Sequence, residues 1–209
     1  MLGKMLDMFI VLLVVVDPVG VIPVFGALTR GSSELHRRRM AVKATLLAAA
    51  ILLMFALIGD WLLTTLGITL PAFKIAGGVL LFLIAIDMVF ARPSGGRSAT
   101  APEQEEARYK EDISVFPLAF PLIAGPGALT TVLLMVGESR GNPLIFTALI
   151  AVLLVMLLLV LVCLLLAGRL MRLLGETGAN VMDRLFGVIL AALAVQFVMD
   201  GVKAGFLGG

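Results

Sequence analysis

Charged residues are scarce in this sequence. Of its 209 residues, 14% are Asp, Glu, Lys or Arg, whereas 61% are hydrophobic. Soluble domains carry about 25% charged residues, so this composition excludes an ordinary soluble protein. The net charge of +2 gives no indication of nucleic-acid binding, because the basic residues gather in short loops between long apolar segments.

Residues that bind metals or form disulfides are also scarce. Cys163 is the only cysteine, which excludes an internal disulfide and favours a packing role inside its apolar segment. His36, the only histidine, lies in a basic loop. The sequence shows neither the clustered ligands of a metal site nor a glycine-rich phosphate loop. We therefore expect no metal, no cofactor and no enzymatic activity.

Long apolar segments fill the rest of the chain. A membrane-spanning helix needs about 20 predominantly apolar residues. Six segments meet this length, and we expect an all-α integral membrane protein that forms a single domain over residues 1–209. The predicted spans are residues 5–28, 42–66, 70–91, 113–137, 144–168 and 183–206. Residues 92–112 are rich in polar residues, proline and glycine and are predicted to be a cytoplasmic linker.

The distribution of basic residues predicts the orientation. Twelve of the sixteen Lys and Arg residues lie in the loops after the first, third and fifth spans. Such loops stay in the cytoplasm, so we expect a protein of the cell (inner) membrane with both termini outside, in the periplasm of a Gram-negative host. Membrane lipid is one expected partner, and nucleic acid is not.

Proline and glycine interrupt the first and fourth spans near their middles. The two interrupted stretches are Asp17-Pro18-Val19-Gly20 and Gly125-Pro126-Gly127-Ala128, the second followed by Thr130-Thr131. A bilayer offers no water to the backbone groups that a helix break exposes, so such a break must be buried in protein or line a wet cavity. Paired breaks at corresponding positions of two halves point to the binding site of a transporter.

Three spans precede the linker and three follow it. An odd number of spans in each half places residues 1–91 and 113–209 in opposite orientations, which predicts two inverted three-helix repeats. The third and sixth spans also resemble each other, because each has a basic residue, Lys74 or Arg184, three positions before a glycine.

The two interrupted stretches resemble the two signatures of the MarC family. The first extends from Asp17 through Gly20 to Pro23, and the second from Ala119 to Thr131. The family comprises small six-span membrane proteins of bacteria and archaea, and the resemblance covers the whole chain. It implies transport of small neutral amino acids. An asparagine often follows the glycine of the first signature in this family, whereas this chain has Val21, which removes a side-chain amide from the expected site.

The predicted substrate site comprises both breaks and a nearby polar residue. Asp17 has two alternative roles: it binds a substrate ammonium, a sodium ion or a coupling proton, or it caps the half-helix that follows Pro18. Thr130 and Thr131 either line the site or bond to a carbonyl of their own helix. Gln196 either contacts the substrate or bonds between helices. The full set is Asp17, Pro18, Val19, Gly20, Gly125, Pro126, Gly127, Ala128, Thr130, Thr131 and Gln196.

These observations favour a secondary transporter of small zwitterions such as glycine or alanine, which works by alternating access. The half-helix after a break offers N–H groups to a carboxylate, and the half-helix before it offers carbonyls to an ammonium or a cation. The alternatives are an exporter of another small metabolite or drug-like solute and a channel. The sequence leaves open the direction of transport, the coupling ion and whether the chain forms a homo-oligomer.

Overall fold

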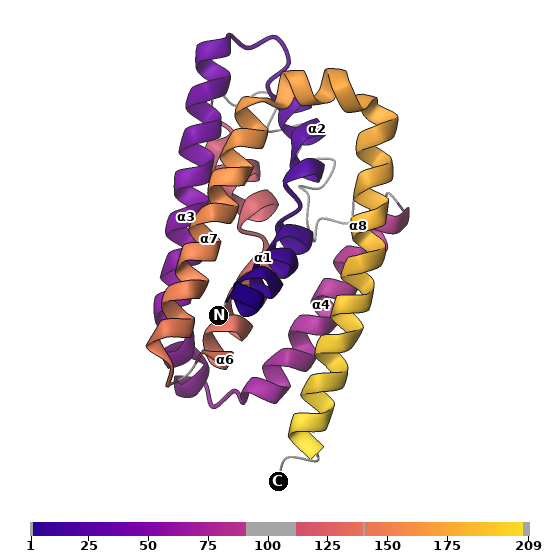
Figure 1. Ribbon diagram of the computed structural model, residues 1–209. Helices are drawn as coiled ribbons and strands as arrows, with labels where there is room; N and C mark the ends of the chain where they lie inside the picture. Colours follow the sequence, from indigo (N-terminus) through magenta and orange to yellow (C-terminus); the bar gives the residue numbers. More distant parts are fainter. Residues whose placement is uncertain (1, 91–111, 140, 207–209) are drawn as a thin grey trace.

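Helices make up every element of the described chain. The computed structural model describes residues 2–90, 112–139 and 141–206, and these ranges contain no strand. The predicted linker of residues 92–112 lies, except for Asp112, outside the described residues. The elements are α1 (Leu2–Val16), α2 (Pro18–Leu28), α3 (Glu34–Thr65), α4 (Leu70–Phe90), η1 (Ser114–Ile123), α6 (Pro126–Glu138), α7 (Pro143–Leu165) and α8 (Ala167–Phe206) (Figure 1).

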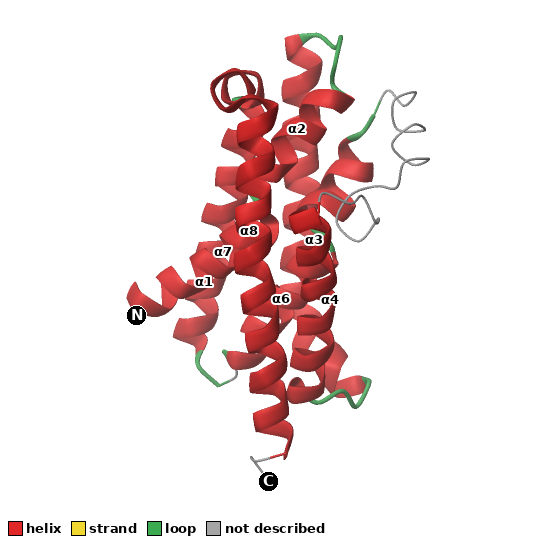
Figure 2. Cartoon of the chain, turned by 90° about the vertical axis from the view of Figure 1, so that its right-hand side faces the viewer, coloured by secondary structure: helices red, strands yellow, loops and turns green. Residues whose placement is uncertain are grey.

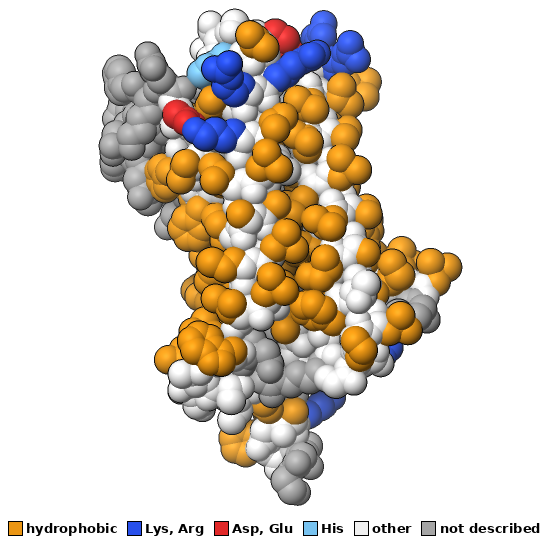
Figure 3. All heavy atoms as spheres, turned by 90° about the vertical axis from the view of Figure 1, so that its left-hand side faces the viewer, with side chains coloured by type: hydrophobic (Ala, Val, Ile, Leu, Met, Phe, Trp, Pro, Cys, Tyr) orange, Lys and Arg blue, Asp and Glu red, His pale blue; other side chains and the backbone are white. Residues whose placement is uncertain are grey.

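Five stretches of the described chain are long and apolar enough to cross a membrane. They become six if η1 and α6, which meet at a bend of 55°, form one span. The first span is Leu2–Leu28, which contains both α1 and α2. Figure 3 shows an apolar surface over the middle of one face, with Lys and Arg gathered at the end where α2 joins α3 and α7 joins α8. The prediction of an all-α membrane protein is confirmed.

Two helices begin earlier than the sequence predicts. α3 begins at Glu34 rather than at residue 42, because Ser33 Oγ accepts a hydrogen bond of 3.2 Å from the His36 backbone N–H. α8 begins at Ala167, and the part of it that can cross a membrane begins at Thr177 rather than at residue 183, after a kink at Gly175. Its first part lies across the basic end of the molecule, and it turns at Gly175, where φ is 66°, to run to the opposite end (Figure 1).

The broken spans lie among the other helices. α2 contacts α8 and α7, while α6 contacts α4 and α3. α1 contacts both α6 and α7, so the first half of one broken span meets the second half of the other. In Figure 2 the start of α1 projects from the side of the bundle, so the buried part of this helix is the part next to the break.

Candidate functional site

Asp17 marks the first break. It has left-handed backbone angles (φ 43°, ψ 75°) and its side chain is fully buried. Pro18 follows at the first position of α2, where its missing N–H leaves no hydrogen bond unmade. Asp17 Oδ1 accepts a hydrogen bond of 3.1 Å from the Gly20 N–H. Of the two predicted roles of Asp17, the capping role is therefore present.

A second carboxylate lies beside Asp17. A β-carbon built on Gly20 would lie 2.3 Å from Asp17 Oδ2 and 2.8 Å from Asp183 Oδ1, so both carboxylates border the same glycine. Asp183 belongs to α8, 166 positions along the chain from Asp17. Sequence reasoning missed Asp183, although an acidic residue at the edge of an apolar span was a signal that could have found it.

The second break lies at Gly125. The π-helical segment η1 ends with a hydrogen bond of 2.8 Å from the Ala124 N–H to the Ala119 carbonyl, and α6 begins with Pro126 at its first position. A β-carbon on Gly125 would lie 2.2 Å from the Pro121 carbonyl oxygen, so this close approach requires glycine. In contrast to α2, α6 has no side-chain cap at its N-terminus.

The two broken spans meet at a small cavity. Val15, which precedes the first break, and Ile84 of α4 line it together with residues around the second break. The cavity offers about 10 Å³, close to the minimum that holds one water molecule. The remaining lining residues are Pro121, Leu122, Ile123, Gly125, Pro126, Gly127 and Ala128. In this conformation the breaks are therefore closed around a space too small for any amino acid.

The two threonines of α6 differ in their surroundings. Thr131 is fully buried, and its hydroxyl has no hydrogen-bond partner among the described residues. The predicted alternative of a bond to a carbonyl of its own helix is therefore wrong for Thr131. Thr130 packs against α4, because a β-carbon on Gly77 would lie 2.1 Å from its Cγ2. Thr131 thus supplies a polar group, six residues beyond the second break, that no described residue uses.

The structure brings together most, but not all, of the predicted site residues. Those buried at the breaks are Asp17, Pro18, Gly125, Gly127, Ala128, Thr130 and Thr131, with Val19, Gly20 and Pro126 half-buried. Gln196 is the exception: it is exposed and donates a hydrogen bond of 2.7 Å to Asp200 Oδ1, one turn further along α8. Its amide is thus used within its own helix rather than at the breaks. Within the described ranges, no three His, Cys, Asp or Glu side chains are grouped as metal ligands would be.

Comparison with known proteins identifies the family. The family model for MarC family integral membrane proteins matches residues 2–206. This chain belongs to the MarC family. The match covers all eight described helices, so the family resemblance predicted from the two interrupted stretches is confirmed, and the chain is an integral membrane protein.

Relatives in this MarC family come from distant organisms. A UPF0056 membrane protein of Methanocaldococcus jannaschii is 38% identical over 92% of this chain and 93% of its own length. In Escherichia coli, the UPF0056 membrane protein YhcE is 35% identical, covering 96% of this chain and 92% of its own. The UPF0056 inner membrane protein YhgN of that bacterium is 32% identical over 99% of this chain and 100% of its own length. No solved structure matches the chain.

Proposed function

We propose that this MarC protein is a secondary transporter of small neutral amino acids in the inner membrane, with both termini outside. In this proposal it acts as a carrier, without enzymatic activity or a cofactor. The observation that carries the proposal is that the two breaks are chemically unequal: the fully buried Asp17 carboxylate lies at one, and the uncapped N-terminus of α6 lies at the other.

A zwitterion fits this pair of breaks. A substrate ammonium would bind near the Asp17 carboxylate, because a buried acid favours a cationic partner. A substrate carboxylate would bind at the N-terminus of α6, where N–H groups and the positive end of the helix dipole favour an anion. The Thr131 hydroxyl adds a polar group that no described residue uses. The space between the breaks is only about 10 Å³ in this conformation, which favours glycine, alanine or serine over large amino acids.

The helix contacts support a carrier built from two inverted repeats. If α1–α2, α3 and α4 correspond to η1–α6, α7 and α8, a two-fold axis exchanges the halves. The contact of α2 with α8 then corresponds to that of α6 with α4, and the contacts of α1 and α2 with α7 correspond to those of η1 and α6 with α3. The axis maps the α4–α8 and α3–α7 contacts onto themselves. Such a pair of halves can rock around a site at their interface, which is alternating access.

The two carboxylates that border Gly20 provide a place for a coupling ion. Two carboxylates that lie close together can share a bound cation. Asp17 and Asp183 come from α2 and α8, so the distance between them depends on how the first half packs against the second. We propose that a proton or a sodium ion bound here couples its gradient to movement of the two halves.

Transport by reconstituted protein tests this function. We expect proteoliposomes to take up radiolabelled glycine or alanine under a proton or sodium gradient, and Asp17→Asn to reduce the rate at least tenfold. The matched control is Asp7→Asn, because Asp7 is an exposed aspartate on the same span. This control is expected to transport like the unchanged protein.

Three results would contradict the proposal. Absence of uptake of every neutral amino acid under either gradient would favour export of another small solute. Flux that does not saturate with substrate concentration would favour a channel. Equal transport by Asp17→Asn and Asp7→Asn would restrict Asp17 to its capping role.

A further inference from the structure

A large cavity lies apart from the breaks, at the basic end of the molecule. It offers about 650 Å³ between the first turns of α3 and the turn that joins α7 to α8. The described residues that border it include four arginines and one glutamate, whose formal charges sum to +3. Its lining residues are Glu34, Arg37, Arg38, Val42, Leu164, Leu165, Leu166, Gly168, Arg169 and Arg172.

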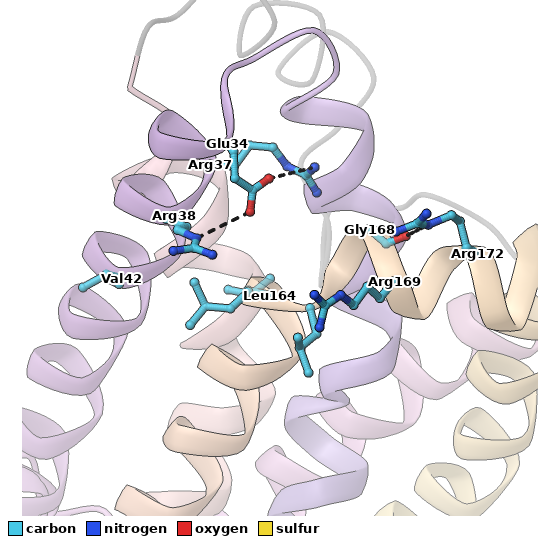
Figure 4. A pocket seen from close by; sticks show the side chains of 10 residues that line it. Glu34, Arg37, Arg38, Val42, Leu164, Gly168, Arg169 and Arg172 are labelled. Atoms are coloured by element: carbon cyan, nitrogen blue, oxygen red, sulfur yellow. Dashed lines mark hydrogen bonds and ion pairs between the residues drawn. The ribbon is translucent and has the colours of Figure 1, made fainter.

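The arginines around this cavity are incompletely paired. Glu34 lies between Arg37 and Arg38, at 3.8 Å and 3.5 Å, as Figure 4 shows. Arg37 Nε is buried and has no hydrogen-bond partner among the described residues. On the α8 side, Arg172 Nε donates a hydrogen bond of 3.2 Å to the carbonyl of Gly168. Neither Arg169 nor Arg172 forms an ion pair within the described part of the chain.

The rest of the cavity is apolar and continues into the lipid-facing surface. Val42, Leu165 and Leu166 are each more than a third exposed. Further along the same two helices, Leu46, Leu158 and Val162 are also exposed. Figure 3 shows this apolar surface directly next to the basic end. A ligand that fills the cavity therefore contacts arginines on one side and apolar side chains on the other.

We propose that this cavity binds an anionic phospholipid, with the phosphate among the arginines and the acyl chains along α3 and α7. Basic pockets between helices at a membrane surface bind anionic headgroups, and guanidinium groups suit phosphate geometry. The apolar side of the cavity distinguishes a lipid from free phosphate, because a free anion gains nothing from contact with leucines. The bound lipid would join α3 of the first half to α8 of the second.

Native mass spectrometry of the purified full chain tests the proposal. We expect phosphatidylglycerol to bind in preference to phosphatidylcholine with the same acyl chains, in 0.15 M salt. Each basic residue near an anionic headgroup contributes a factor of about five to binding. Arg169→Gln is therefore expected to weaken phosphatidylglycerol binding about fivefold. Its matched control is Arg39→Gln, because Arg39 is an exposed arginine at the same end that does not line the cavity.

Each outcome decides for or against the lipid site. Weaker binding by Arg169→Gln with unchanged binding by Arg39→Gln supports it. Equal binding of the two lipids overturns it, as does an equal effect of the two substitutions, which would indicate general attraction by the basic end. Full displacement of phosphatidylglycerol by millimolar inorganic phosphate also overturns it and indicates a free-anion site. These readouts do not depend on transport.

Discussion

At the scale of single residues, each break places a proline at the first position of the following helix, but the two helices are capped differently. Pro18 and Pro126 both occupy the first position of a helix, where the absent N–H costs nothing. Asp17 then satisfies an N–H of α2, whereas Gly125 has no side chain to do so for α6. The hydroxyl of Thr131 is likewise unsatisfied among the described residues. The second break therefore retains hydrogen-bonding capacity that the fold itself does not use.

The hydroxyl of Thr131 provides a prediction about stability and function. A buried polar group without a partner costs about 1–3 kcal/mol, so Thr131→Val should stabilise the protein by roughly 1 kcal/mol and raise its melting temperature in detergent. If the hydroxyl contacts substrate, the same variant should bind glycine or alanine more weakly. Both effects are measured by thermal unfolding with and without the amino acid.

The control for this substitution is Thr45→Val. Thr45 is also buried, but its hydroxyl already donates a bond of 2.9 Å to the Ala41 carbonyl. We expect Thr45→Val to leave the melting temperature unchanged or lower. A Thr131→Val variant that melts below the unchanged protein would contradict the absence of a partner.

The sequence predicted part of this site, for reasons visible at individual residues. Prolines and glycines act on their own backbone, so Pro18, Gly125 and Pro126 could be placed at helix breaks directly. Asp183 could not be paired with Asp17, because their proximity depends on how α8 packs against α2. The bond of Gln196 to Asp200 within α8 could not be predicted either, because α8 is apolar on several sides and its pattern does not fix its rotation.

At the scale of elements, α4 and α8 pack closely through glycines on both helices. A β-carbon on Gly78 would lie 2.7 Å from the Ala194 carbonyl oxygen, and one on Gly201 would lie 2.8 Å from the Pro71 carbonyl oxygen. A β-carbon on Gly187 would lie 2.8 Å from Met88 Cβ. Small residues at such interfaces let backbones approach, which is a main source of helix association in membranes.

Substitution of these glycines should therefore separate the helices. We expect Gly78→Ala to destabilise the protein by about 1–3 kcal/mol, because the new methyl group meets backbone atoms that cannot move aside. The matched control is Gly26→Ala in α2, where a β-carbon meets nothing within 4 Å. That change should be neutral or stabilise the helix by up to about 1 kcal/mol. The melting temperatures of Gly78→Ala and Gly26→Ala are measured in the same detergent. Equal melting temperatures would contradict the close packing of α4 and α8.

Helix boundaries were the least predictable feature of the elements. The early start of α3 could have been found, since Ser33 before Glu34 is a helix-start signal. Residues 175–180 are polar and contain two glycines, which indicates a loop, and the kink of α8 lies at the first of these residues, Gly175. The sequence did not indicate that residues 167–174 form a helix across the basic end, or that the helix resumes directly after Gly175.

At the scale of the whole molecule, ion pairs join the two halves. Lys43 of α3 pairs with Asp112 before η1. Lys74 of α4 pairs with Glu138 of α6 at 2.5 Å. Asp112 also accepts hydrogen bonds from the N–H and hydroxyl of Ser114, the first residue of η1. Bonds to Lys43 and Ser114 lower the pKa of Asp112 to about 2.

This pKa shift predicts a pH dependence of stability. Because the pKa is lower in the folded protein than in the unfolded chain, the stabilisation by Asp112 is complete above about pH 4. It decreases as the pH falls towards 2. The difference in melting temperature between the unchanged protein and Asp112→Asn should be constant from pH 5 to 7 and disappear near pH 2. A constant difference down to pH 2 would contradict the shift.

The small cavity between the breaks also has a consequence for the voltage across the membrane. A membrane stores work as voltage, and each elementary charge that crosses 100 mV releases about 2.3 kcal/mol. A protein with two broken spans is a place where protons or sodium could leak and discharge that voltage. In this structure the cavity between Val15, Ile84 and the second break has room for about one water molecule. We therefore expect the protein in this conformation to pass little ion current through the breaks and so to preserve the membrane voltage.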